Sequence, residues 1–286
     1  MIKIRMGGVP EHFNLPWHLA MERGAPADLG IDLQWRDYPD GSGAMAAALR
    51  GGELDAALLL TEGAVAGIAG GGDFKVASLY TDSPLLWGIH VPAESRLHTV
   101  SDLRGARYAI SRRGSGSHLM AFVHARQQGW PLEALELVIV RNLAGAIDAF
   151  ASGAADVFFW EKFMTKPLVD SGQFRRVGEF VAPWPAFVLC VADTAGTEQR
   201  AAFARLLPVV LAQAAALATQ PDAAALIGAR YALEPRDVGE WLGATRWSQR
   251  AGVVPGDLTA VVAALAELEL IRSDFAPATA VAEWAR

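Results

Sequence analysis

The hydrophobic pattern of the first half of the chain occurs twice. Residues 48–59 are ALRGGELDAALL, and residues 149–160 are AFASGAADVFFW. Both segments predict the last turn of a helix, a glycine suited to the left-handed conformation that ends many helices, an aspartate and a buried strand. Asp55 and Asp156 occupy the same place in the two copies.

The segments before these copies match as well, because each runs from a strand pattern through an amphipathic helix pattern to another strand pattern. In order, they are residues 2–6, 12–23 and 31–35 in the first copy and residues 107–111, 118–128 and 137–140 in the second. Each copy therefore predicts a β-α-β-α-β unit. Two such units predict two lobes, and we expect the functional site in a cleft between them.

The second lobe is expected to be an insertion in the first. Residues 85–91 and 187–191 have the apolar pattern of strands that leave the first lobe and return to it. The expected division is residues 1–89 and 188–286 for the first lobe and 90–187 for the second, with a hinge near His90 and Phe187. The chain from Thr197 onward is rich in alanine and leucine and predicts a helical C-terminal extension of the first lobe.

Charge and composition argue against two classes of protein, those that bind nucleic acids and those that span a membrane. A net charge of −6 and a pI of about 5.5 argue against a nucleic-acid partner. The longest charge-free apolar run, residues 206–219, is shorter than the roughly 20 residues that cross a bilayer, so we expect a soluble protein without a membrane span. A strand pattern begins at Ile2, with no signal-peptide pattern before it. The sequence as written predicts a cytoplasmic protein, or a periplasmic one if a leader was removed.

Motifs for metals and cofactors are missing from the sequence. Cys190 is the only cysteine, and the six histidines show no paired ligand spacing such as H-E-x-x-H. Residues 114–119 resemble part of a dinucleotide fingerprint, but Leu119 stands where the third glycine is needed. We therefore expect no metal and no cofactor.

Two loops of small residues precede predicted helices. Residues 40–43 (DGSG) and 114–117 (GSGS) expose backbone N–H groups at the positive end of a helix dipole, a place suited to an anionic group. Arg112 beside the second loop adds positive charge. Alternatively, Ser42 and Ser117 only cap their helices. The sequence leaves both interpretations open.

Two glutamates follow the aligned strands of the repeat. Glu62 and Glu161 lie at odd offsets from the repeat aspartates, which predicts corresponding sides of their strands. One carboxylate from each lobe would then face a cationic or N–H-donating ligand. The alternative is structural, with Glu161 paired to Lys162 or an arginine and Glu62 near a helix start. No nucleophile accompanies these glutamates, and we assign no catalytic residue.

The candidate ligand-binding residues gather after the predicted strands, where open parallel α/β sheets bind ligands. The tryptophans among them either stack on a flat ligand or pack in the core. The full set is Glu11, His12, Asn14, Ser42, Thr61, Glu62, Arg112, Ser115, Gly116, Ser117, His118, Asn142, Trp160, Glu161, Lys162 and Trp184.

Over residues 1 to 190 the chain resembles the type II solute-binding proteins of the nitrate, sulfonate and taurine class, which are similar in fold to the thiamine-pyrimidine synthase family. The matching segments are Pro10–His12, Leu49–Asp55, Val100–Gly105 and Ser111–His118. The resemblance implies a two-lobed α/β fold of the type II periplasmic-binding-protein kind, each lobe a mainly parallel sheet flanked by helices. It also implies a small ligand between the lobes, with residues 115–118 holding an anionic group, and an ABC transporter permease as partner. The cysteine-rich motif of the pyrimidine synthases is absent.

We therefore expect a binding protein for a small polar metabolite, flat or zwitterionic, held in an interlobe cleft that closes about a hinge. The alternatives are an enzyme on the same scaffold that acts on a pyrimidine or quinone precursor, and a cytoplasmic ligand sensor.

Overall fold

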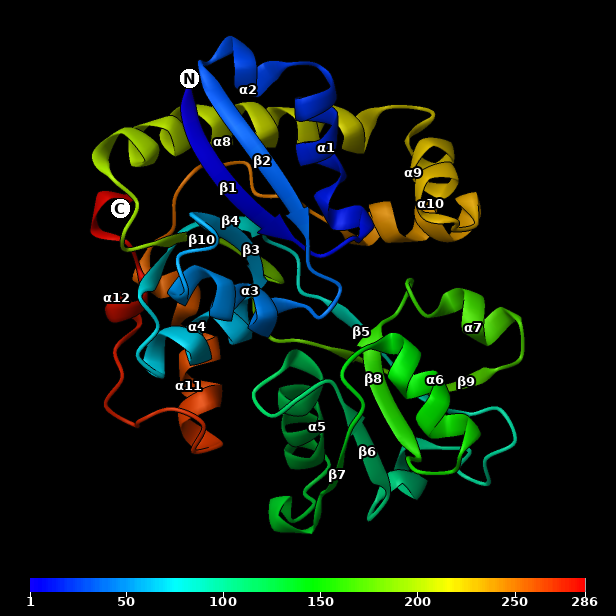
Figure 1. Cartoon of the computed structure of the whole chain (residues 1–286). Helices are drawn as coiled ribbons and strands as arrows, with labels where there is room; N and C mark the ends of the chain where they lie inside the picture. The colour runs from blue at the N-terminus through cyan, green and yellow to red at the C-terminus, as the bar shows by residue number, and fades with distance from the viewer. Residues whose placement is uncertain (286) are drawn as a thin grey trace. The chain divides into compact units, whose positions relative to one another are not determined.

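Two five-stranded mixed sheets form the framework of the protein, which a computed structural model describes from residue 1 to residue 285 (Figure 1). The chain divides into two units, each with one sheet flanked by helices. Unit 1 comprises Met1–Pro84 and Trp184–Arg286, and unit 2 comprises Leu85–Pro183. These boundaries lie a few residues before the expected ones.

The sheet of unit 1 has the strand order β2-β1-β3-β10-β4. Its strands are β1 (Ile2–Gly8), β2 (Ile31–Asp37), β3 (Ala56–Leu60), β4 (Phe74–Thr81) and β10 (Phe187–Ala192). β1 pairs in parallel with β2 and β3, whereas β10 pairs antiparallel with β3 and β4. Four strands therefore run in one direction and β10 alone in the other.

The sheet of unit 2 repeats this arrangement strand by strand, in the order β7-β6-β8-β5-β9. Its strands are β5 (Leu86–Pro92), β6 (Arg107–Ile110), β7 (Glu136–Ile139), β8 (Val157–Glu161) and β9 (Phe174–Val181). Here β5 is the one strand of opposite direction, since it pairs antiparallel with β8 and β9. The predicted α/β fold with mainly parallel sheets is confirmed.

Helices flank both sheets. Unit 1 has α1 (Leu15–Glu22), α2 (Ala25–Asp28), α3 (Ser42–Arg50), α4 (Thr61–Ala69), α8 (Thr197–Thr219), α9 (Ala223–Tyr231), α10 (Pro235–Ala244), α11 (Thr259–Glu267) and α12 (Pro277–Ala280), with 3-10 turns η1 (His12–Asn14), η4 (Pro255–Leu258) and η5 (Glu283–Ala285). Unit 2 has α5 (Gly116–Gln127), α6 (Leu143–Ala151) and α7 (Lys166–Asp170), with 3-10 turns η2 (Val100–Leu103) and η3 (Leu132–Ala134). The helical C-terminal extension is therefore present.

Helix α8 is longer than the apolar run at residues 206–219 suggested. Its 23 residues are sufficient in length and apolar character to cross a membrane, and α8 is the one such helix among residues 1–285. Half of its most apolar stretch is buried, however, and it packs against α1 and β1 within unit 1 (Figure 1). This burial is the behaviour of a core helix.

The repeat aspartates hold the central strand of each sheet. In unit 1, the backbone N–H and Nε of Arg5 donate to Asp55 Oδ2 at 2.7 and 3.1 Å, and Nη2 donates to Oδ1 at 2.6 Å. In unit 2, Arg107 makes the same three bonds to Asp156, at 2.9, 2.9 and 2.8 Å. Each aspartate returns its own N–H to the arginine carbonyl at 2.8 Å. The two aspartates at equivalent positions of the sequence repeat therefore form equivalent ion pairs in the two units.

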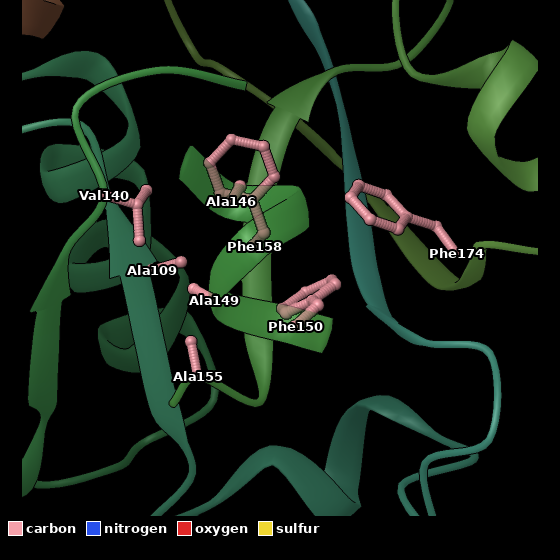
Figure 2. Packing of buried hydrophobic residues seen from close by; sticks show 8 residues of the cluster. All are labelled: Ala109, Val140, Ala146, Ala149, Phe150, Ala155, Phe158 and Phe174. Atoms are coloured by element: carbon pink, nitrogen blue, oxygen red, sulfur yellow. The ribbon is translucent and has the colours of Figure 1, made fainter. Parts of the chain in front are cut away.

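A cluster of small and aromatic side chains fixes α6 on the sheet of unit 2. It consists of Ala109, Val140, Ala146, Ala149, Phe150, Ala155, Phe158 and Phe174 (Figure 2). Alanines on α6 and β6 allow close approach, and the rings of Phe150 and Phe174 meet edge to face at 4.8 Å. This packing holds α6 against β6, β8 and β9.

Two irregular connections, residues 82–85 and 182–186, join the units. In unit 1 the N–H of Ala186 donates to Ser83 O at 3.1 Å, and in unit 2 the N–H of Ala182 donates to Leu85 O at 3.2 Å. Prolines 84, 183 and 185 lie between these bonds and have no N–H to continue the ladder. The positions expected for the hinge, His90 and Phe187, lie instead inside β5 and β10.

The two ion pairs differ in burial, and this difference tests how much each contributes to the free energy of unfolding. The Asp55 side chain is 8% exposed and that of Asp156 is 32% exposed. We expect Asp55→Asn to lower the free energy of unfolding by about 2 kcal/mol and Asp156→Asn by about 1 kcal/mol or less. Urea unfolding followed by circular dichroism measures both, with the exposed Asp148→Asn as control. Equal losses, or a larger loss for Asp156→Asn, would contradict the role assigned to burial.

Candidate functional site

The polar residues at the end of β3 hold neighbouring segments of unit 1 in place. Ser42 Oγ, in the first turn of α3, accepts the N–H of Leu60 at 2.9 Å. Thr61 Oγ1 donates to Pro185 O at 2.5 Å, and its N–H donates to Ala186 O at 3.1 Å. Ser42 is therefore not the cap of α3, because its hydroxyl serves the adjacent strand end instead.

Glu62 is buried beside the connection that re-enters unit 1. It is 2% exposed, and its Oε2 accepts the indole N–H of Trp184 at 2.8 Å. Burial raises the pKa of the Glu62 carboxyl to about 7. Helix α4 begins at Thr61, so Glu62 stands in a helix, whereas β8 continues through Glu161. The two glutamates therefore do not occupy equivalent places, and the expectation from their odd offsets is wrong.

The loop after β1 faces the C-terminal helices of unit 1. The His12 ring lies 4.1 Å from that of Trp241 on α10, is fully buried, and has no partner for either nitrogen. Burial lowers the pKa of His12 to about 3. Asn14 donates to Val9 O at 2.7 Å and thereby closes the loop. Glu11 is half-buried, and burial raises its pKa to about 7.

In unit 2, serines organise the segment between β6 and α5, residues 111–118, which we call the α5 loop. Ser115 caps α5, since its Oγ accepts the N–H of His118 at 3.3 Å. Ser117 Oγ accepts the N–H of Ser111 at 2.9 Å and is 2% exposed. Ser117 therefore fastens the end of β6 and does not cap the helix. Gly114 has φ of 77°, a left-handed conformation that favours glycine.

His118 has one nitrogen engaged and one free. The N–H of Gly114 donates to His118 Nδ1 at 3.0 Å, and the ring meets Phe122 edge to face at 4.9 Å. Nε2 is buried and has no hydrogen-bond partner. Burial, with Arg113 nearby, lowers the pKa of His118 to about 4, so the ring is neutral at pH 7.

The start of α6 lies beside the α5 loop. Arg141 donates its N–H to Ser111 O at 3.0 Å, has φ of 72° and is exposed. Asn142 caps α6, with its Oδ1 accepting the N–H of Gly145 at 3.0 Å. A Cβ at Gly145 would overlap the carbonyl of Val140, so this tight turn requires glycine. The N-termini of α5 and α6 thus open at one edge of the sheet, with Gly116 in the first turn of α5.

The remaining candidates of unit 2 are engaged within it. Glu161 Oε2 accepts the N–H groups of Phe163 and Met164 at 2.9 and 2.6 Å. Lys162 pairs with Glu179 at 2.9 Å, not with Glu161. Trp160 packs against the hydrophobic cluster of unit 2 and stacks on Phe158, with ring centroids 5.1 Å apart. Among residues 1–285, no group of three or more histidine, cysteine, aspartate or glutamate side chains is placed to hold a metal ion.

Several polar residues near strand ends were not in the predicted set, among them Arg113, Arg141 and Tyr38. Tyr38 follows β2, and its buried hydroxyl has no hydrogen-bond partner. The guanidinium of Arg36 lies 5.0 Å from its ring centroid. The sequence signal was a tyrosine after a predicted strand, three residues before Gly41, at the same edge as the other candidates of unit 1.

Comparison with known proteins identifies the fold of the chain. The model of the family described as Ca3427-like PBP matches residues 87–180, about a third of the chain, which lies within unit 2. The Candida albicans CA3427 gene product, described as having the generic periplasmic binding protein fold, superposes with a TM-score of 0.90, 21% identity, and coverage of 99% of this chain and 97% of that one. The protein has the periplasmic-binding-protein fold. No curated protein matches the sequence.

Sulfonate-binding proteins are among the similar structures. The alkanesulfonate-binding protein SsuA from Xanthomonas axonopodis pv. citri, bound to MOPS, has a TM-score of 0.83 at 18% identity, covering 99% of this chain and 98% of that one. The periplasmic aliphatic sulphonate binding protein SsuA from Escherichia coli has a TM-score of 0.76 at 18% identity, covering 98% and 97%. The predicted resemblance to type II solute-binding proteins is confirmed at the level of the fold.

The buried Glu62 carboxyl predicts a specific pH dependence of stability. Its folded pKa of about 7 lies above the ordinary value of 4.5, so its contribution is fully present below pH 4.5 and is lost as pH rises through 7. Glu62→Gln keeps an oxygen for the Trp184 indole and removes the ionisation. We expect this variant to gain stability relative to the unsubstituted protein between pH 4.5 and 7.5, by about 1–3 kcal/mol. Thermal unfolding across this range measures it.

The matched control is Glu53→Gln, because the Glu53 side chain is 63% exposed. The control should follow the unsubstituted protein at every pH. Parallel pH profiles for Glu62→Gln and the unsubstituted protein would show that the carboxyl does not titrate in the folded state as described.

Proposed function

We propose that the protein binds a small solute through an anionic group held at the N-termini of α5 and α6 in unit 2. The observation that carries this proposal is the concentration of positive charge and N–H donors at that edge. Arg112, Arg113 and Arg141 stand beside the two helix starts. The first-turn amides of a helix have no intrahelical acceptor, and the helix dipole adds partial positive charge there.

A sulfonate or carboxylate is the anionic group that we favour. The likeness to two proteins named for sulfonate binding supports this choice, as does the Gly/Ser composition of the α5 loop, which lets backbone amides approach the ligand. We further propose that the solute lies between the units, with the strand ends of unit 1 as its second surface. Glu11, half-buried in the loop after β1, offers a carboxyl to an N–H-bearing end of the solute.

Binding between the units implies that they close about the connections at residues 82–85 and 182–186. The three prolines there interrupt the hydrogen-bond ladder, so rotation at these points breaks few backbone bonds. A transporter permease is the proposed partner, because the class that the chain resembles serves ABC transporters, and service to an importer would place the protein outside the cytoplasm.

Isothermal calorimetry tests the proposal with MOPS, ethanesulfonate, inorganic sulfate and inorganic phosphate as probes, and native mass spectrometry tests for a retained solute. We expect a sulfonate to bind one to one. Arg113→Gln should weaken that binding by roughly threefold to tenfold, because an exposed charge close to an anion contributes about 1 kcal/mol. The exposed Arg104→Gln, before β6 at the opposite end of the strand, is the matched control and should leave affinity unchanged.

Two results would count against the proposal. Equal losses in Arg113→Gln and Arg104→Gln would place the anion elsewhere, since only general electrostatics would then be at work. No binding of any probe and no retained solute would overturn the function itself. Turnover of a bound solute into a product would instead favour the enzyme alternative.

A further inference from the structure

The first turn of α4 holds the chain at the point where it re-enters unit 1. Thr61 Oγ1 donates to Pro185 O at 2.5 Å, and the Thr61 N–H donates to Ala186 O at 3.1 Å. Glu62 Oε2 accepts the indole N–H of Trp184 at 2.8 Å. Two consecutive residues of α4 therefore bind three consecutive residues of the second connection. We call these three hydrogen bonds the α4 clasp.

The second connection has few other polar groups with which to attach to unit 1. Pro183 and Pro185 have no N–H, and the N–H of Ala186 donates to Ser83 O in the first connection. Helix α4, in contrast, follows β3 directly, because β3 ends at Leu60. The α4 clasp therefore links the second connection to the central strand of the unit 1 sheet.

The clasp encloses an ionisable group. Glu62 and Trp184 are each 2% exposed, and burial raises the pKa of the Glu62 carboxyl to about 7, while the backbone N–H of Glu62 and the indole N–H of Trp184 act to lower it. Within residues 1–285, no cation pairs with this carboxyl. A carboxylate accepts an indole N–H more strongly than a neutral acid does, but one such bond does not replace the hydration that a buried charge loses. Ionisation therefore favours a form in which water reaches Glu62.

We propose that the α4 clasp is a pH-sensitive attachment of the second connection, which holds the connection against unit 1 when Glu62 is protonated and releases it when Glu62 is ionised. The inference concerns unit 1 alone and requires no solute, so it does not depend on the proposed function. If the units close about the two connections, as proposed above, ionisation of Glu62 frees one of them for that movement.

Hydrogen exchange followed by NMR at pH 5 and pH 8 measures opening of the clasp, with each rate divided by that of an unstructured peptide at the same pH. The Thr61 N–H and the Trp184 indole N–H report on the clasp. The Asp55 N–H, which donates to Arg5 O at the other end of β3, reports on unfolding of unit 1. Opening returns the Glu62 pKa from about 7 towards 4.5, so the two clasp protons should lose protection by about tenfold to a hundredfold between pH 5 and pH 8. They should also be less protected than the Asp55 N–H at both pH values.

Three variants separate the parts of the clasp. Glu62→Gln keeps an oxygen for the Trp184 indole and removes the ionisation, so protection of the indole N–H should be the same at pH 5 and pH 8. Thr61→Val removes the hydroxyl bond to Pro185 O and keeps the ionisation. It should lower that protection by roughly threefold to tenfold at both pH values and leave the pH dependence intact. The control, Glu53→Gln at an exposed position, should match the unsubstituted protein.

Equal protection of the clasp protons at pH 5 and pH 8 in the unsubstituted protein would overturn this inference, and that measurement needs no variant. A loss of the same size in Glu62→Gln would overturn it as well, because a group other than Glu62 would then be titrating. Equal protection of the Thr61 and Asp55 N–H groups at both pH values would show that the clasp opens only when unit 1 unfolds, which also contradicts the inference. None of these outcomes bears on solute binding, which calorimetry tests separately.

Discussion

The interaction on which the rest of the structure depends is the arginine–aspartate pair that occurs once in each unit. Arg5 with Asp55, and Arg107 with Asp156, join the first strand of a β-α-β-α-β unit to the residue just before its third strand. The bond is bidentate and charge-assisted, a geometry that fixes direction as well as distance. It sets the register at the amino end of the strands, and the carboxyl ends, where the candidate residues lie, follow from that register.

The α5 loop follows the carboxyl end of β6. Its serine hydroxyls form hydrogen bonds with backbone N–H groups of the same loop. Ser115 and Ser117 satisfy the N–H groups of His118 and Ser111, and Asn142 does the same for Gly145. These side chains hold the starts of α5 and α6 in place, and the proposed function assigns the first-turn backbone amides of these helices to the anionic group of a solute. The rigidity is useful, because a preorganised site loses less entropy on binding.

The fold was predicted well because the spacing of apolar residues along the sequence identifies helices and strands. The repeated pattern around Asp55 and Asp156 gave the duplicated unit, and the apolar run at 187–191 gave the returning strand. The ion pairs themselves were missed, since Arg5 and Arg107 have no local pattern that points to an aspartate some fifty residues on. Long-range pairing of this kind becomes visible only when the strands are placed side by side.

The candidate site was predicted less well, for a physical reason. The ends of the predicted strands identify one edge of the sheet. The sequence does not show which polar side chains at that edge form hydrogen bonds with nearby backbone N–H groups. Glu161 is the last residue of β8, at the expected edge of the sheet, yet its carboxylate accepts the N–H groups of Phe163 and Met164. His12 lies in the expected loop, but Trp241, more than two hundred residues later, decides that it is buried. Likewise, His118 Nδ1 is engaged because the turn at Gly114 brings a backbone N–H to it.

Hydrogen exchange, measured by mass spectrometry with and without a saturating sulfonate, tests most directly the proposal that one solute engages both units. A solute held between them slows amide exchange in the α5 loop and at residues 141–145 of unit 2, and also at residues 9–14 and 38–42 of unit 1. The connections at 82–85 and 182–186 change with them if the units close. Slower exchange confined to unit 2 at full saturation would contradict the account.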